Sequence, residues 1–366
     1  MTLATETTTR PARKFRITRS QRNVAWTGVA ALIIVVVFAM LPYIVYSSTT
    51  AILVQAFILL TLASMWNLLA GYAGLVSVGQ QAFVGLGAYF VLILALHGTS
   101  PFAALPVAAV ACGAAAFPLW WLVSRLRTGY FAIATWVMAA TIMLIIERFS
   151  SIGGGTGLPL PGLSGYSPTL LSAYTYWIGL AVTVVALTAT YLLLRGRLGL
   201  VLTAVRDDEV AARSSGARVG LARMLVFIVA GIGCGAAGGL LAISQLQVQP
   251  SAVFSVQWTA EMAFAAIIGG LGTIEGPIVG TAVFIILQQT LASYNAWYLI
   301  ILGLVAMFVA LFARRGLWGL VDQHLHVRLF PVGYWLRESG SGGRHLRRRG
   351  GGQPGELGQP GTEGAG

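Results

Sequence analysis

Long apolar runs separated by short polar segments make up most of this chain. A helix needs about 20 apolar residues to cross the hydrocarbon core of a bilayer. Such runs predict crossings near 24–46, 50–70, 78–96, 103–124, 130–147, 175–194, 223–246, 277–293 and 297–313. A shorter run at 259–268 precedes a Gly-rich stretch and predicts a broken or re-entrant helix. The pattern predicts an all-α polytopic membrane protein with about ten transmembrane helices, nine and eleven being the alternatives.

The composition supports a membrane protein. Only 9% of the residues are charged, compared with about 25% in a typical soluble domain, and 57% are hydrophobic. Residues 23–194 contain four charged side chains, namely Arg125, Arg127, Glu147 and Arg148. A soluble fold of this length could not hide so much apolar surface, so the composition excludes a cytosolic enzyme.

The basic residues predict the orientation of the chain. The formal charge is +12, but the arginines lie between apolar runs, which argues against nucleic-acid binding. Alternation from a cytoplasmic N-terminus leaves 22 of the 23 basic residues inside and only Arg148 outside. The positive-inside rule therefore predicts a multi-pass protein of the inner or plasma membrane, with both termini in the cytoplasm.

Three regions are expected along the chain. A basic cytoplasmic segment, 1–22, precedes a transmembrane domain, 23–320, and a Gly- and Arg-rich tail, 321–366, is expected to be disordered. The first apolar run is longer than the core of a cleavable signal peptide, so it is expected to remain as a helix. Cys112 and Cys234 lie inside apolar runs and are expected to be packing residues.

Glycines recur at helix-packing and turn positions. Gly231, Gly235 and Gly239 form two successive GxxxG steps, and Gly276 and Gly280 form another. Such spacing indicates close helix packing within one bundle, with a dimerisation face as the alternative. Two Gly-rich segments, whose GxxG starts lie 198 residues apart, are expected to form tight turns or helix breaks and hint at an internal repeat. Their candidate structural glycines are Gly71, Gly74, Gly79, Gly269, Gly270, Gly272 and Gly276.

The chain lacks the residues of an ATP-binding loop. Walker A needs a lysine after its glycines, and the only lysine is Lys14, in TRPARK. The histidines have no Cys or acidic partners at metal-ligand spacing, and no nucleophilic triad is evident. We therefore expect no enzyme activity, no metal site and no cofactor in this chain.

The segment 195–222 is the one sizeable polar stretch between predicted crossings. Asp207 or Asp208 suits an N-cap and Gly216 suits a C′ position, which predicts a short helix over about 208–215. Val210, Ala211 and Ala212 are expected to form a small apolar surface flanked by charges. Such a helix suits a groove in a partner protein, and a lipid-surface or purely connecting helix is the alternative.

Five segments resemble the membrane subunits of branched-chain amino acid ABC importers, the LivM-type permeases. They are AVRDDEVAARSSG within Gly199–Gly216, NLLAGYAGLVSVGQQAFVGLGAY at Asn67–Tyr89, RLRTGYFAIAT at Arg125–Thr135, GGGTGL at Gly153–Leu158, and IGGLGTIEGPIVG at Ile268–Gly280. The resemblance covers about residues 25–320, and the five segments occur in the family's order. The tail beyond about residue 325 has no counterpart in this resemblance.

The resemblance implies one half of a pore formed by two permeases. A homologous second permease, two cytoplasmic ATPase subunits that hold ATP and Mg²⁺, and an extracytoplasmic binding protein complete such importers. The implied ATPase-coupling residues are Asp207, Asp208, Glu209, Ala211, Ala212 and Gly216. In the importer motif E-A-A-x-x-x-G, Val210 stands where Glu is usual and Glu209 lies one position early, which leaves the role of Glu209 open.

Polar residues inside apolar runs are candidates for the solute path. They are Gln55, Asn67, Gln80, Gln81, Gln245, Glu261, Gln288 and Gln289. For the amides the alternative is an interhelical hydrogen bond. Glu261 could instead pair with the sister permease or lie at an interface near Trp258.

The resemblance implies uptake of branched-chain or other amino acids, urea or short amides. The largest outside segment, 148–174, is expected to contact the binding protein. An ion-coupled secondary transporter and a non-transporting membrane scaffold or receptor are the alternative functions. A secondary transporter usually carries ionisable residues at mid-membrane, and this chain offers little beyond Glu261.

Overall fold

The computed structural model describes residues 15–18, 22–126, 128–163, 165–291, 300–301, 303–305, 307–308, 316–325 and 335–338. The chain divides into two compact units, one formed by Met1–Ala25 with Gly333–Gly366 and the other by Trp26–Val332. In the first unit, strand β1 (Phe15–Thr18) pairs antiparallel with β4 (Trp335–Glu338).

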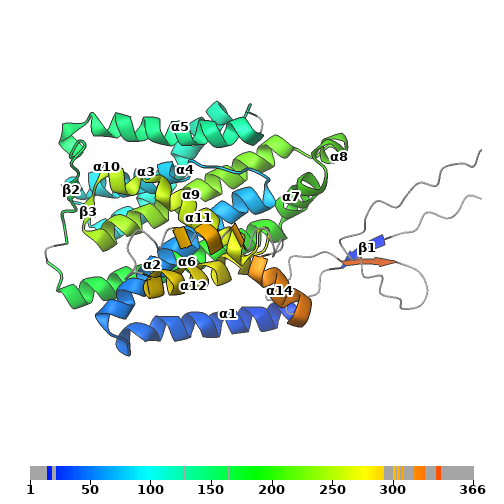
Figure 1. Cartoon of the computed structure of the whole chain (residues 1–366), viewed down its shortest axis with the longest axis horizontal. Helices are drawn as coiled ribbons and strands as arrows, with labels where there is room; N and C mark the ends of the chain where they lie inside the picture. The colour runs from blue at the N-terminus through cyan, green and yellow to red at the C-terminus, as the bar shows by residue number, and fades with distance from the viewer. Residues whose placement is uncertain are drawn as a thin grey trace, which may run out of the picture. The chain divides into compact units, whose positions relative to one another are not determined.

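The second unit is a bundle of helices (Figure 1). Its longer helices are α1 (Arg22–Met40), α2 (Ser47–Asn67), α3 (Gln81–Leu96), α4 (Pro101–Val123), α5 (Thr128–Glu147), α6 (Pro168–Arg195), α9 (Val219–Gln245), α11 (Val256–Gly269) and α12 (Glu275–Leu291). The shorter elements are η1 (Leu41–Tyr43), η2 (Leu68–Tyr72), η3 (Ser150–Ile152), α7 (Arg197–Asp207), α8 (Glu209–Ser214), α10 (Pro250–Val253), α14 (Gly316–Leu325), and the strands β2 (Leu158–Pro159) and β3 (Gln247–Val248). The strands β2 and β3 pair antiparallel.

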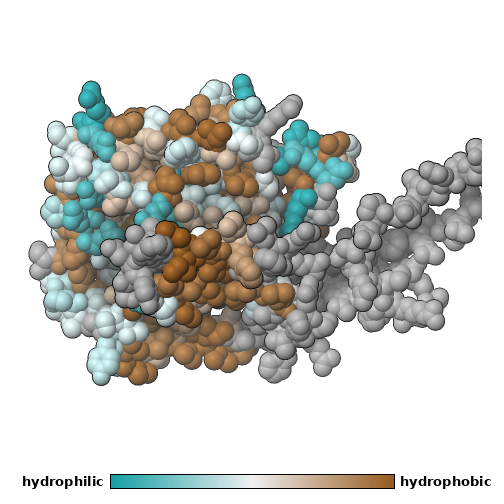
Figure 2. All heavy atoms as spheres, viewed as in Figure 1, coloured by the Kyte–Doolittle hydropathy of each residue, from teal (hydrophilic) through white to brown (hydrophobic). Residues whose placement is uncertain are grey.

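The structure confirms the all-α membrane class. Within the described residues, six helical stretches are long and apolar enough to cross a membrane, namely Ser48–Tyr72, Pro101–Val123, Gly129–Glu147, Pro168–Arg195, Val219–Gln245 and Pro250–Gly269. Figure 2 shows apolar side chains over the middle of the bundle and hydrophilic ones towards its ends. Most of the predicted crossing at 297–313 lies outside the described residues, and the count of about ten stays a prediction.

Two helix starts differ from the predicted runs. Helix α6 begins at Pro168 rather than near 175, because Ser167 caps it by accepting a hydrogen bond from the Leu170 amide at 3.4 Å. The run predicted at 259–268 is part of a longer helical stretch, Pro250–Gly269. This stretch consists of the short helix α10 and of α11, which Ser255 caps, and the apolar pattern missed its first part because polar residues such as Ser255 and Gln257 interrupt the apolar run.

Part of the segment expected to be disordered is ordered. Helix α14 extends to Leu325, and residues 335–338 form β4, so the expectation for 321–366 is wrong at these positions. Helix α14 forms because Leu317 packs beside the apolar cluster of Phe264 and Phe284, and Gly316 lies against the backbone of Gly270. Residues 339–366 lie outside the described residues.

Close contact between helix backbones builds the core. A Cβ atom on Gly87 of α3 would collide with the carbonyl oxygen of Gly235 on α9, and one on Gly238 would collide with the carbonyl oxygen of Val84. Gly235 also faces Cys112 on α4, whose thiol is buried like that of Cys234. The GxxxG steps of α9 therefore pack within the chain, and both cysteines are packing residues, as the sequence predicts.

The second GxxxG step joins α11 to α12. A Cβ on Gly280 would collide with the carbonyl oxygen of Ala265, and one on Gly269 would collide with that of Gly276. The backbones of α11 and α12 are therefore in direct contact on both sides of the turn that connects the two helices.

We predict that Gly238→Ala destabilises the protein, whereas Gly220→Ala in the same helix does not. The added methyl group at 238 meets a backbone carbonyl, and overpacking of this kind costs about 1–3 kcal/mol. At Gly220 no atom lies within 4 Å of the new Cβ, so the higher helix propensity of Ala gains up to about 1 kcal/mol. Thermal unfolding of both purified variants measures the difference. Equal stability of the two would contradict the backbone contact.

Candidate functional site

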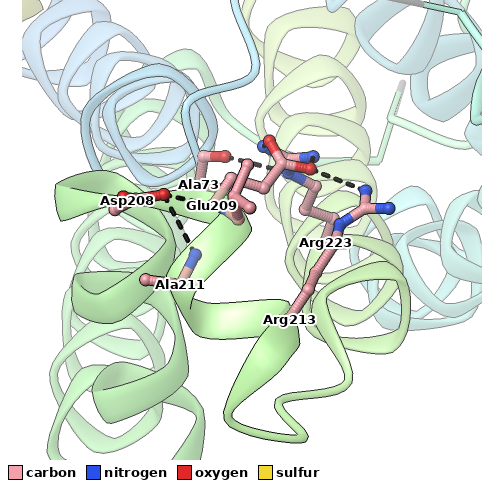
Figure 3. A network of polar contacts seen from close by, with 7 residues as sticks. Ala73, Asp208, Glu209, Ala211, Arg213 and Arg223 are labelled. Atoms are coloured by element: carbon pink, nitrogen blue, oxygen red, sulfur yellow. Dashed lines mark hydrogen bonds and ion pairs between the residues drawn. The ribbon is translucent and has the colours of Figure 1, made fainter.

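Helix α8 is the short helix predicted in the polar segment. Asp208 caps it, because its Oδ1 accepts hydrogen bonds from the amides of Val210 at 2.8 Å and Ala211 at 3.0 Å (Figure 3). Gly216 follows the helix with a φ of +82°, a left-handed value that favours glycine. The structure thus selects Asp208 over Asp207 as the N-cap and confirms Gly216 at the C′ position.

Helix α8 turns different faces inward and outward. Ala212 is buried and packs with Val205 of α7 and Val219 of α9. Val210 is 74% exposed, and Ala211 is also exposed. The expected apolar surface of three consecutive residues is therefore wrong for Ala212, because successive helix residues point about 100° apart. The outward apolar surface consists of Val210 and Ala211.

Glu209 makes a charged cluster with two arginines. Its Oε1 accepts from Arg213 Nη2 at 2.6 Å and from Arg223 Nη1 at 3.0 Å, and its Oε2 accepts from Arg223 Nη2 at 2.9 Å (Figure 3). The hydrogen bonds from Arg223 are the largest influence on this carboxyl, and they lower its pKa from the ordinary value of 4.5. A lowered pKa keeps the carboxylate charged at neutral pH, and the pair is lost only as the pH falls through that lowered pKa.

Arg223 also holds the end of another helix. Its Nε donates to the carbonyl oxygen of Ala73 at 3.3 Å (Figure 3). Ala73 directly follows η2, the π-helical turn that ends α2. The sequence interpretation counted Arg223 only as a cytoplasmic charge. A single arginine near the start of a helix that carries no other charge is the signal that could have indicated a specific acceptor.

The two Gly-rich turns lie against each other. Asn67 Nδ2 donates to the carbonyl oxygen of Thr273 at 2.8 Å, and the amide of Gly272 donates to Asn67 Oδ1 at 2.9 Å. A Cβ on Gly71 would reach the backbone nitrogen of Gly272. The segments that hinted at an internal repeat in the sequence are therefore direct neighbours in space.

The candidate turn glycines fall into two classes. Gly74, Gly270 and Gly272 have φ values of +67°, +127° and +74°, and so need the conformational freedom of glycine. The others face backbone atoms that leave no room for a side chain, namely Gly71, Gly79, Gly269 and Gly276. Tight turns and helix breaks are therefore confirmed for both segments.

Most of the candidate path amides bond to groups within the bundle. Gln81 Oε1 accepts from the Thr259 hydroxyl, and Gln80 Nε2 donates to Ser77 Oγ at 3.4 Å. Gln55 Nε2 donates to Gln288 Oε1 at 3.2 Å. These bonds fit the interhelical alternative for Gln55 and Gln81. By contrast, Gln245 is exposed at the end of α9, as is Gln289 near the end of α12.

Glu261 is a buried acid on α11. Only 6% of the residue is exposed, and its Oε1 accepts from Nε2 of the exposed Gln257 at 2.8 Å. The exposed side-chain amide of Gln257 therefore covers the buried carboxyl group of Glu261, one helical turn further along α11. Whether Glu261 and the candidate amides line the solute path stays a prediction.

The expected outside loop is ordered over the residues described. It contains η3 and β2, and the amide of Leu160 donates to the carbonyl oxygen of Leu246 at 2.9 Å. Gly153 and Gly157 have φ values of +99° and +78°. The loop is thus fixed against the end of α9, at the other end of the bundle from α8 (Figure 1). Within the described residues, no group of three His, Cys, Asp or Glu side chains could hold a metal ion.

The family of permease components of branched-chain amino acid transport systems matches residues 48–310. The chain belongs to this family. The six long apolar helices of the described residues agree with this membership, so the chain is an integral membrane protein and a transport permease. The family resemblance drawn from the five sequence segments is confirmed.

Two curated relatives carry the name high-affinity branched-chain amino acid transport system permease protein LivM. The protein from Escherichia coli (strain K12) is 26% identical over 327 residues, which cover 82% of this chain and 76% of the relative. The protein from Salmonella typhimurium (strain LT2) is 25% identical over 314 residues, which cover 78% and 74%. No solved structure matches the chain. Both relatives are thus named as permease proteins of a transport system.

We predict that Asn67→Leu destabilises the protein more than Gln245→Leu does. Asn67 is 1% exposed, and its loss leaves the amide of Gly272 and the carbonyl of Thr273 without this partner. Each buried group left unsatisfied costs about 1–3 kcal/mol. Gln245 provides the control, because it loses an exposed amide. Unfolding in detergent measures both, and equal midpoints would contradict a bridging role for Asn67.

Proposed function

We propose that this chain is a membrane-spanning subunit of an ATP-driven ABC importer. The observation that carries the proposal is α8, a helix capped by Asp208 that presents Val210 and Ala211 outward beside the ends of apolar helices. Two observations support ATP hydrolysis by a separate subunit. The chain belongs to a transport family, and its sequence has no Walker A motif.

Val210 and Ala211 would enter a groove of the ATPase subunit. An exposed apolar side chain on a short helix with acidic residues at its start suits such a groove. Closure of two ATPase subunits on ATP would then displace α8 and switch the bundle between outward- and inward-facing states. In this proposal, Asp208 and Gly216 fix the start and end of the docking helix.

The proposed cargo is a branched-chain or related small amino acid. The names of the relatives from the two enteric bacteria support this class. A solute with both an ammonium and a carboxylate group suits a neutral polar lining better than fixed charge. Glu261, which Gln257 covers, is the one candidate path residue with an ionisable side chain.

The proposed assembly contains a second permease, two ATPase subunits and an extracytoplasmic binding protein. The ordered loop after α5 would contact the binding protein, because it lies at the opposite end of the bundle from α8. The placement of basic residues supports a cell-membrane protein with cytoplasmic termini and contact with membrane lipid.

Reconstituted transport tests this function. The full complex in liposomes is expected to accumulate labelled leucine only with ATP on the ATPase side and binding protein on the other side. Uptake that follows an ion gradient without ATP would favour a secondary transporter, for which the buried Glu261 is the supporting observation. Such a result would overturn the proposed function.

Val210→Asp is expected to weaken retention of the ATPase subunits. A charge at the centre of an apolar contact removes a docking residue, and central contacts contribute more than about 1 kcal/mol, or about five- to tenfold in affinity. Copurification of the ATPase with the permease measures this loss. Leu200→Asp on α7 is the control, since it adds the same charge at another exposed apolar position. Equal retention by both variants would contradict docking at Val210.

Gly216→Pro is expected to abolish uptake, and Gly216→Ala to reduce it less. Proline requires a φ near −65°, whereas Gly216 has +82°, and proline also removes the amide that donates to the Arg213 carbonyl at 3.0 Å. Alanine keeps that amide and bears a left-handed penalty of about 1–2 kcal/mol. Uptake by membrane vesicles measures both variants. Normal transport by the proline variant would refute the coupling role of α8.

A further inference from the structure

One guanidinium group connects α8 to the broken end of α2. Arg223 holds both carboxylate oxygens of Glu209 through Nη1 and Nη2, and it holds the Ala73 carbonyl through Nε. The side chain of Arg223 is 20% exposed and that of Glu209 is 36% exposed. Because the guanidinium is planar and rigid, a displacement of Glu209 moves the Nε donor as well.

The acceptor lies where helix α2 ends in an irregular turn. The α2 helix ends in the π-helical turn η2, and Ala73 is the residue after that turn. Such turns occur frequently at functional sites, and the carbonyl groups beyond a helix end lack helical partners. A contact from Arg223 to this carbonyl therefore acts on the least regular point of α2.

The broken end of α2 is itself bonded to the turn between α11 and α12. Asn67 bridges Gly272 and Thr273, and Gly71 lies against Gly272. A second arginine, Arg206 of α7, also lies against Gly272, since a Cβ there would meet its guanidinium. The contacts thus run from α8 through Arg223 to the end of α2, and through Asn67 to α11 and α12.

We propose that Arg223 is a positioning residue that converts movement of α8 into movement of the two glycine turns. The proposal rests on the proposed function, because it requires an ATPase that moves α8. It also assigns a role to Glu209. This carboxylate binds Arg223 of α9 within the chain, and it does not serve as a contact for the ATPase subunit. A partly exposed ion pair contributes little to folding stability, so the value of this pair lies in its geometry.

The experiment uses the complete importer in liposomes and measures uptake and ATP hydrolysis together. Arg223→Lys keeps the charge but loses the two-pronged contact and the Nε donor. Its uptake per ATP hydrolysed is expected to fall by about fivefold or more. ATPase retention and the unfolding midpoint are expected to stay near those of the wild type. Arg148→Lys, an exposed arginine in the turn directly after α5, is the matched control.

A charge exchange separates the ion pair from the contact with Ala73. Glu209→Arg combined with Arg223→Glu restores the attraction between α8 and α9, but a glutamate cannot donate to the Ala73 carbonyl. The exchanged protein is expected to remain uncoupled. Full recovery of uptake per ATP would overturn the inference, because the ion pair alone would then be sufficient.

A second variant covers the case in which Arg223→Lys fails to fold. Glu209→Gln leaves Arg223 and its contact with Ala73 in place, and it changes a partly exposed group. It is expected to lower uptake per ATP as well, because α8 loses its ion pair with Arg223. Wild-type coupling in this variant, or in a folded Arg223→Lys protein, would overturn the inference.

The outcomes also distinguish this inference from the proposed function. If the wild-type complex takes up solute without ATP, the proposed function fails. If the wild type requires ATP but Arg223→Lys loses the ATPase subunits rather than coupling, the importer role stands, and Arg223 acts in docking instead of positioning.

Discussion

A helix that breaks inside a membrane bundle leaves backbone groups that lipid cannot satisfy. This constraint shapes the region where α2 and α11 end. Asn67 supplies a donor and an acceptor to the turn after α11, and Arg223 supplies a donor to the Ala73 carbonyl. The glycines of both turns allow these partners to approach, because a side chain at Gly71 or Gly272 would occupy the space they use. The two breaks are therefore stable only together.

A second constraint of the bilayer explains why the helices around α9 are so closely packed. Glycines at Gly87, Gly235 and Gly238 bring α3 and α9 into backbone contact. Such contact provides the dispersion attraction that holds helices together in lipid, where apolar side chains gain little by meeting one another. The core around α9 is thus assembled through its smallest residues.

The sequence predicted local features much better than long-range ones. Caps and turns depend on neighbouring residues, so the cap at Asp207 or Asp208, Gly216 and the turn glycines were found from their positions alone. The Gln81–Thr259 and Asn67–Gly272 contacts join residues far apart in the chain, and an amide in an apolar run does not indicate which helix it will face. The start of α6 was missed because hydropathy marks the apolar part of a helix rather than its capped end.

The two connections at the broken end of α2 differ in electrical character. Asn67 joins neutral groups, whereas Glu209 and Arg223 attract each other as charges near the surface. Dissolved ions screen surface charges over about 8 Å at physiological ionic strength, and over about 3 Å at 1 M salt. Because the Glu209–Arg223 pair is only partly exposed and its atoms lie about as close as the shorter of these lengths, salt weakens this pair only in part, while the hydrogen bonds of Asn67 join neutral groups that have no net charge to screen. The bundle thus contains one connection that ions can loosen and one that they leave unchanged.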